Sequence, residues 1–139
     1  MILKPRYFKL EELVPQDLFE LYKNKQDYLW WVFDQRATWT LDKIRMRYGK
    51  AVVNTWLWGG SSHHRGLRCY GSEVGAPLSQ HIFGRAFDVT VIGKESSEIR
   101  MDILENQNLD EFKFIRCLEM GVPHIHFDTR NWTGDLLLI

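Results

Sequence analysis

The sequence predicts an α+β domain with helices gathered near the N-terminus and a small, mostly antiparallel sheet after them. Helical spacing of apolar residues dominates the first third of the chain, and short segments rich in β-branched and aromatic residues follow it. The chain has 139 residues, of which 45% are hydrophobic, which suffices for one hydrophobic core. We therefore expect residues 1–139 to form a single domain.

The first predicted elements are helices. The segment LEELVPQDLFELYKN places apolar side chains at near-helical intervals: Leu10, Leu13, Leu18, Leu21 and Tyr22. Pro15 divides this segment into a turn and a helix proper. In the segment TLDKIRMRYG, Thr40 is the expected N-cap of a second helix and Gly49 is its expected C-terminal stop.

The following segments predict strands around a long loop. AVVNTWLW switches to β-branched and aromatic residues, which predicts a strand over about Ala51 to Trp56. From Gly59 to Gly75 the chain is rich in glycine, serine and histidine without periodicity, and loops of this length are usually functional. RAFDVTVI then alternates as a strand does, and FKFIRCLEM and HIHFDT predict two more strands. Between RAFDVTVI and FKFIRCLEM, Ser96 or Ser97 is the expected N-cap of a helix in SSEIRMDILENQ.

Charge and composition exclude several classes of partner. The formal net charge is zero, so nothing predicts attraction to nucleic acid or to an anionic membrane surface. No segment approaches the roughly 18 apolar residues of a membrane span, and the N-terminal segment lacks an apolar signal region. We expect a monomer that is cytoplasmic at synthesis. In that reducing compartment, Cys69 and Cys117 are expected to be free and largely buried thiols.

Two histidines and an aspartate are candidate metal ligands. His81 ends the long loop, and Asp88 follows in a strand, where a core-facing carboxylate is costly unless it is paired or binds a cation. Gly84 allows a turn that folds His81 back beside Asp88. In HIHFD, alternation places His124 and His126 on one face of a strand. Spacing alone leaves two interpretations open, a metal site or hydrogen-bonded structural residues.

A resemblance to a known family favours the metal site. SQHIFGRAFD matches every fixed position of the motif S-x-H-x-x-G-x-A-x-D of peptidase family M15, the zinc D-Ala-D-Ala carboxypeptidases and endolysins. RGLRCYGSEVGAPLSQH is similar to the family segment that precedes this motif, and PHIHFDTRNW resembles its closing strand. The H-x-H pattern also resembles lysostaphin-type peptidases and the hedgehog signalling domain, so a hedgehog/DD-peptidase-like fold is implied. The resemblance covers about residues 54–132, and the N-terminal third carries no recognisable motif.

The resemblance implies a zinc site and a histidine beside it that assists catalysis. His81, Asp88 and His126 match the three zinc ligands of the family. His124 matches the first histidine of H-x-H, a position that polarises the substrate or stabilises an oxyanion. Zinc held by two imidazoles and one carboxylate keeps an open position for the attacking water.

The resemblance also implies substrate contacts. Arg68 matches the arginine that holds a substrate carboxylate, a task suited to the bidentate guanidinium fork. Arg65 and Arg85 are the alternatives for this position. Ser79 matches a residue near the substrate backbone, although a serine that caps a turn has the same pattern.

The general base departs from the family pattern. Some members carry the acid three positions before the last ligand, where this chain has Pro123. Glu119, seven positions before His126, is the nearest upstream acid and our predicted base. Asp128 is the alternative, but we expect it to orient a metal ligand instead.

Together these features predict a zinc-dependent peptidase that cuts peptidoglycan stem peptides, either as an endolysin-type endopeptidase or as a D-Ala-D-Ala carboxypeptidase. The absence of a signal region favours a phage enzyme that is released in an infected host or carried in a virion, and that acts on the cell wall. Two alternatives stay open: a zinc-bearing binding module without turnover, and a phage structural protein that binds no metal.

Overall fold

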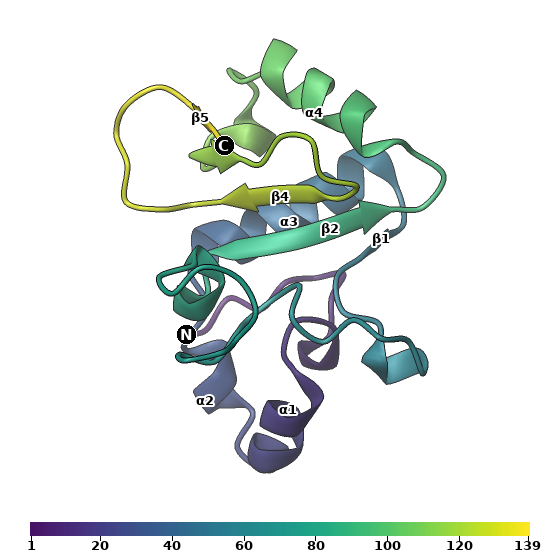
Figure 1. The fold of residues 1–139 in the computed structure, drawn as a ribbon, viewed down its shortest axis with the longest axis vertical. Helices are drawn as coiled ribbons and strands as arrows, with labels where there is room; N and C mark the ends of the chain where they lie inside the picture. Colours follow the sequence, from purple (N-terminus) through teal and green to yellow (C-terminus); the bar gives the residue numbers. More distant parts are fainter.

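A five-stranded sheet organises the chain, and the computed structural model describes all of residues 1–139 (Figure 1). Its strands are β1 (Ala51–Val52), β2 (Ala86–Val91), β3 (Cys117–Leu118), β4 (Ile125–Asp128) and β5 (Leu137–Leu138), in the spatial order β1-β2-β4-β3-β5. All neighbouring pairs are antiparallel except β3 and β5, which run parallel. The predicted α+β class with a mostly antiparallel sheet is confirmed.

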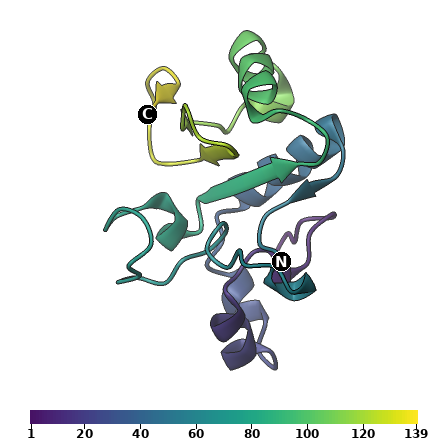
Figure 2. The same cartoon turned by 45° about the vertical axis from the view of Figure 1, so that its right-hand side comes forward.

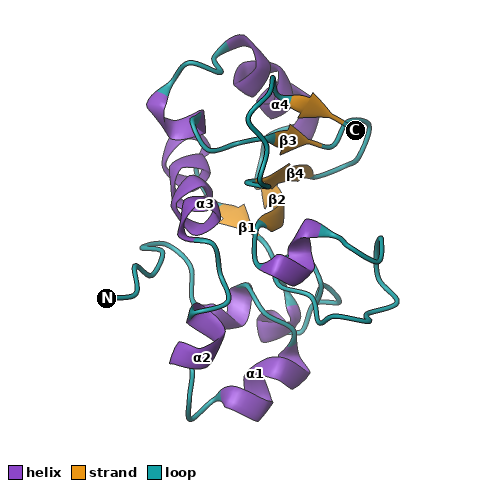
Figure 3. Cartoon of the chain, turned by 90° about the vertical axis from the view of Figure 1, so that its left-hand side faces the viewer, coloured by secondary structure: helices purple, strands orange, loops and turns teal.

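Four α-helices surround the sheet: α1 (Gln16–Tyr22), α2 (Asp27–Trp30), α3 (Gln35–Tyr48) and α4 (Ser96–Glu105). α3 passes behind β2 and β4, while α1 and α2 gather at one end of the molecule and α4 at the other (Figures 1, 2 and 3). Short 3-10 turns complete the elements, at Leu10–Glu12, Trp56–Trp58, Gln80–Phe83 and Asp110–Phe112. None of the helices combines the length and the apolar composition that a bilayer crossing requires.

The two central strands divide their side chains between the core and the opposite face. Phe87 and Phe127 are register partners and fully buried, and the ring of Phe33 stacks on Phe87 at a centroid distance of 5.8 Å. Successive side chains of a strand point to opposite faces, so the next residue pair in the register, Asp88 and His126, faces away from these rings. The aromatic core thus fixes the two candidate ligands on the other side of the sheet.

The start of α3 corrects one expectation. Thr40 lies inside the helix, where its Oγ1 donates to the carbonyl of Arg36 at 2.8 Å. The N-cap is Asp34, whose carboxylate accepts the backbone N–H of Arg36 at 2.9 Å and satisfies one of the free donors of the first turn. The predicted stop at Gly49 is confirmed, as is the division of the first segment at Pro15.

Two predicted strands are much shorter than expected. After β1 the chain turns away, because Asn54 Nδ2 and Trp56 Nε1 both donate to the carbonyl of Val14, at 3.0 and 2.8 Å. The predicted strand over FKFIRCLEM shrinks to β3, since Asp110–Phe112 forms a 3-10 turn before it. The contacts that end β1 are therefore made with a segment about 40 residues away, whereas the turn that shortens the later strand is local.

Two smaller expectations are also corrected, and two short elements were not predicted. The N-cap of α4 is Glu95 rather than Ser96 or Ser97, and the Ser96 hydroxyl instead donates to the carbonyl of Pro123 at 3.0 Å. Both cysteines are free thiols as predicted, but only Cys117 is buried, whereas Cys69 is exposed. The sequence analysis also missed α2 and β5, which are too short to show a periodic pattern.

Gly84 joins the 3-10 turn to β2, and we expect Gly84→Ala to destabilise the protein more than Gly93→Ala. Both glycines have positive φ, +66° and +80°, where an alanine costs about 1–2 kcal/mol. A Cβ at Gly84 would lie 2.4 Å from the carbonyl oxygen of Val32, whereas a Cβ at Gly93 meets nothing within 4 Å. Overpacking adds about 1–3 kcal/mol at Gly84 alone.

Urea unfolding of both variants measures this difference directly. Equal losses in the free energy of unfolding would show that the backbone of Val32 does not confine this turn.

Candidate metal centre

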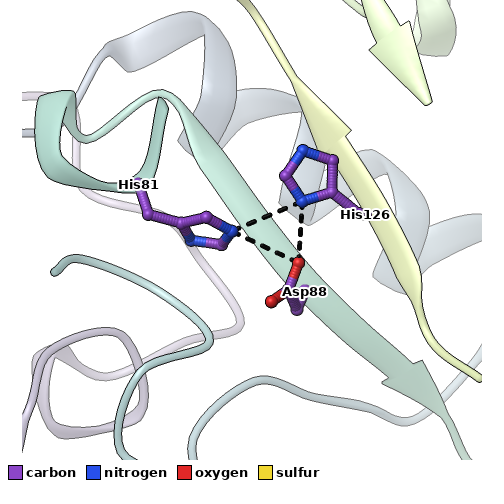
Figure 4. Close-up of side chains that lie close together, drawn as sticks. All are labelled: His81, Asp88 and His126. Atoms are coloured by element: carbon purple, nitrogen blue, oxygen red, sulfur yellow. Dashed lines mark hydrogen bonds and ion pairs between the residues drawn. The ribbon is translucent and has the colours of Figure 1, made fainter. Parts of the chain in front are cut away.

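Three side chains from two strands and one turn converge on a single point (Figure 4). Asp88 on β2 is the register partner of His126 on β4, so the sheet itself sets these two side by side. His81 lies in the 3-10 turn Gln80–Phe83, and Gly84, in the left-handed conformation, turns the chain from there into β2. The fold therefore brings together the three residues that the sequence predicted as metal ligands, and all three are buried.

The distances between the candidate ligand atoms suit a tetrahedral metal. His81 Nε2 lies 3.3 Å from Asp88 Oδ1 and 3.4 Å from His126 Nδ1, and His126 Nδ1 lies 2.8 Å from Asp88 Oδ1 (Figure 4). Ligands bound about 2.0–2.1 Å from a tetrahedral zinc ion stand about 3.3–3.4 Å apart. Two of the three separations meet this value, and the third requires a shift of about 0.5 Å.

Hydrogen bonds behind the triad select which imidazole nitrogens face it. His81 Nδ1 lies 2.8 Å from the carbonyl oxygen of Gly66, which only accepts, so Nδ1 carries the proton and Nε2 presents its lone pair. His126 Nε2 lies 3.4 Å from Asp128 Oδ2, which leaves His126 Nδ1 directed at Asp88. Metal-binding histidines are held in this way by a carbonyl or carboxylate on the far nitrogen.

The electrostatics of the triad favour a cation. Burial would raise the pKa of Asp88, but hydrogen bonds from His126 and His81 outweigh it and hold this pKa well below its usual range. Burial would lower the pKa of His126, but the carboxylates of Asp128 and Asp88 outweigh it and raise the pKa to about 9. The site thus keeps positive charge next to the Asp88 carboxylate, and a metal ion would replace the His126 proton.

A cavity of about 500 Å³ opens beside the triad. Its walls include every site residue that the sequence predicted: Arg68, Ser79, His81, Asp88, Glu119, His124 and His126. Apolar side chains from the long loop and the last residue of the chain complete the wall: Val74, Ala76, Leu78 and Ile139. The triad therefore faces a space that can admit a ligand.

The three candidate arginines differ in where they point. Arg68 lines the cavity with a side chain only 11% exposed; its Nη2 donates to Asp88 Oδ2 at 3.2 Å, and its Nε donates to the carbonyl of His64 at 2.6 Å. Arg65 donates to Thr90 Oγ1 instead. Arg85 lies outside the cavity lining, with its Nε 3.8 Å from a carboxylate oxygen of Asp34.

Ser79 and His124 lie beside the ligands. The Ser79 hydroxyl accepts the backbone N–H of His81 at 3.4 Å and caps the 3-10 turn. His124 Nε2 lies 3.6 Å from Asp88 Oδ1 on the same side of the sheet as His126, as strand alternation predicted. Burial lowers the pKa of His124 in spite of the opposing charge of Asp88, so its ring is neutral at neutral pH and carries one N–H donor.

The two candidate bases occupy different places. Glu119 lines the cavity, its side chain is 38% exposed, and its Oε2 lies 3.9 Å from His126 Nδ1. Asp128 is fully buried and does not line the cavity, because Arg130 and His126 take up its carboxylate. Of the two acids, only Glu119 can therefore meet a molecule in the cavity.

Comparison with known proteins agrees with this site. The family model described as Peptidase M15 matches residues 7–128. The chain belongs to peptidase family M15. Neither the curated proteins nor the solved structures contain a significant match to it. Membership of M15 makes the protein a peptidase, a hydrolase of peptide bonds, with a His–Asp–His site of the kind that metallopeptidases use.

The family match includes the N-terminal third, which the sequence analysis could not assign. The structure explains its presence, because Leu67 donates its backbone N–H to the carbonyl of Leu13 at 2.8 Å. A Cβ on Gly66 would lie only 2.1 Å from that same oxygen, so the two segments are in close contact. The N-terminal segment thus supports the loop whose Gly66 carbonyl orients His81.

Other functional contacts have little or no sequence signal. The carbonyl of Gly66 is a backbone group, and no side-chain pattern marks it. Arg130 lines the cavity and binds Asp128; it lies within PHIHFDTRNW, but the sequence analysis assigned it no role.

We expect the purified protein to retain about one equivalent of zinc after dialysis, and His81→Ala to lose it. The variant removes one of three buried ligand atoms and leaves two, which is fewer than the three protein ligands of a catalytic zinc site. His63→Ala is the matched control, since His63 lies outside the triad and stacks on Trp56. Elemental analysis gives the metal content of all three proteins, and equal zinc in His81→Ala would refute this ligand assignment.

Proposed function

We propose that this peptidase uses zinc to hydrolyse peptide bonds in peptidoglycan stem peptides. The observation that carries the proposal is the convergence of the ligand atoms of His81, Asp88 and His126 beside a cavity that Glu119 also lines. Family membership supports the peptidase reaction. The proposed substrate lies in the bacterial cell wall, and the setting of a phage lysin is part of the same proposal.

The donor set suits zinc. Two imidazole nitrogens and one carboxylate oxygen are a common ligand set of catalytic zinc sites, which leave a further position open. When bound there, zinc supplies Lewis acidity, which lowers the pKa of a water molecule and polarises the substrate carbonyl. His81, Asp88 and His126 would hold the ion, while the cavity gives substrate access to it.

Glu119 is the proposed general base. Its carboxylate lies at the cavity wall, 3.9 Å from Nδ1 of His126. From there the carboxylate can reach a water molecule at the centre of the site. It would take the proton of the attacking water and later return it to the leaving amine.

His124 is the proposed oxyanion donor. Its neutral ring presents an N–H, and Nε2 lies 3.6 Å from Asp88 Oδ1, so this donor borders the same centre. A charge that develops on the carbonyl oxygen of the substrate would accept that hydrogen bond. Donors in comparable sites lower the barrier by about 3 kcal/mol.

Arg68 is the proposed contact for a substrate carboxylate. Its Nε and Nη2 are engaged by His64 and Asp88, and its Nη1 makes no hydrogen bond within the protein. Stem peptides contain D-Ala and D-Glu, which offer free carboxylates to a guanidinium at the cavity wall. Ser79, on the same wall, would border the substrate backbone.

We expect Glu119→Gln to keep zinc and to lose at least about 100-fold in turnover, because an amide cannot accept the proton of water. Glu105→Gln, an exposed position at the end of α4, is the matched control and should retain full activity. Mass spectrometry of digested muropeptides measures turnover and identifies the bond that is cut.

The same experiment separates the competing interpretations. If the wild type binds zinc but cuts no muropeptide of the panel, the protein does not hydrolyse peptidoglycan. The zinc-bearing binding module without turnover would then be the remaining interpretation. Full activity in Glu119→Gln would exclude Glu119 as the base without touching the zinc assignment.

A further inference from the structure

An ion pair with a buried carboxylate lies directly behind one of the candidate ligands. Asp128, at the end of β4, is 0% exposed, and both oxygens of its carboxylate accept hydrogen bonds from Arg130. Arg130 Nε donates to Oδ1 at 2.8 Å, Arg130 Nη2 donates to Oδ2 at 2.6 Å, and the Arg130 backbone N–H donates to Oδ1 at 3.2 Å. These three bonds fix both the position and the plane of the carboxylate.

That carboxylate is the one that faces His126. Its Oδ2 accepts from His126 Nε2 at 3.4 Å, and the opposite nitrogen, Nδ1, lies 2.8 Å from Asp88 Oδ1. A continuous series of contacts therefore runs from the Arg130 guanidinium through Asp128 and the imidazole ring to the metal position. The orientation of the ring depends on the oxygen that Arg130 holds in place.

We propose that Arg130 is a positioning residue for the metal centre: its guanidinium fixes Asp128 so that His126 presents Nδ1 to the ion. The inference rests on the proposed zinc site. Without the guanidinium, Asp128 would be a buried carboxylate whose remaining contacts do not define its plane, and His126 would lose its fixed partner.

The chain contains an internal reference for this arrangement. Asp34 binds Arg36 with the same two-residue spacing and the same three donors, at 2.9 Å for the backbone N–H, 3.1 Å for Nε and 2.6 Å for Nη2. There the pair caps α3. The same local structure thus occurs twice, and only the copy at Asp128 contacts a candidate ligand.

The two copies provide a matched test, Arg130→Met against Arg36→Met. Both changes remove a guanidinium from the same local structure, so both should lower the melting temperature of the apoprotein. Only Arg130→Met should weaken zinc binding, by about 10-fold or more, as measured by competition with a chromophoric chelator. It should also change the visible absorption spectrum of the Co²⁺-substituted protein, which reports ligand geometry. Arg130→Lys restores the charge without the fork and should give an intermediate affinity.

Four results would overturn the inference. Zinc affinity and Co²⁺ spectrum unchanged in Arg130→Met would show that Arg130 does not position His126. The same result with a raised KM would make Arg130 a substrate contact, since it also lines the cavity. A wild type that binds no zinc would refute the proposed function and this inference with it. If Arg130→Met fails to fold, the isosteric Asp128→Asn replaces it, and unchanged zinc affinity there would equally refute the proposal.

Discussion

The antiparallel register between β2 and β4 determines which side chains meet at the site and which enter the core. It sets Asp88 opposite His126 and, one position earlier, Phe87 opposite Phe127. Because side chains alternate along a strand, one register both buries the aromatic pair and turns the two ligands to the opposite face. A slip of one residue would place a carboxylate among the core rings, so hydrophobic burial enforces the geometry of the polar site.

The site is built from groups that are costly to bury. His81, Asp88, His126 and Asp128 are all removed from solvent, and each would destabilise the fold if it lacked a partner. Each has one: the Gly66 carbonyl, the guanidinium groups of Arg68 and Arg130 and the neighbouring ligands share their hydrogen bonds. The core contributes the opposing stabilisation, a cluster of 23 buried apolar residues that includes Phe87 and Phe127.

Sequence reasoning succeeded where one residue determines a local structure and failed where distant segments compete. The spacing of His81, Gly84 and Asp88 predicted the turn into a strand, and alternation predicted the common face of His124 and His126, because both depend on neighbours in the chain. Thr40 was wrongly taken as a cap, since Asp34, six residues earlier, caps the helix. The early end of β1 depends on Val14, some 40 residues away, which no local pattern shows.

The contact between Leu13 and the loop at Gly66 and Leu67 gives the N-terminal segment a part in the chemistry. The candidate ligands lie far from the N-terminal segment in sequence. The carbonyl that fixes the tautomer of His81 nevertheless belongs to a loop that packs against this segment. Residues 54–132, grafted onto another protein, would contain every candidate ligand but would lack the contact with Leu13. The segment that carries the motif is therefore not sufficient to build the site, because the N-terminal residues that support it lie outside that segment.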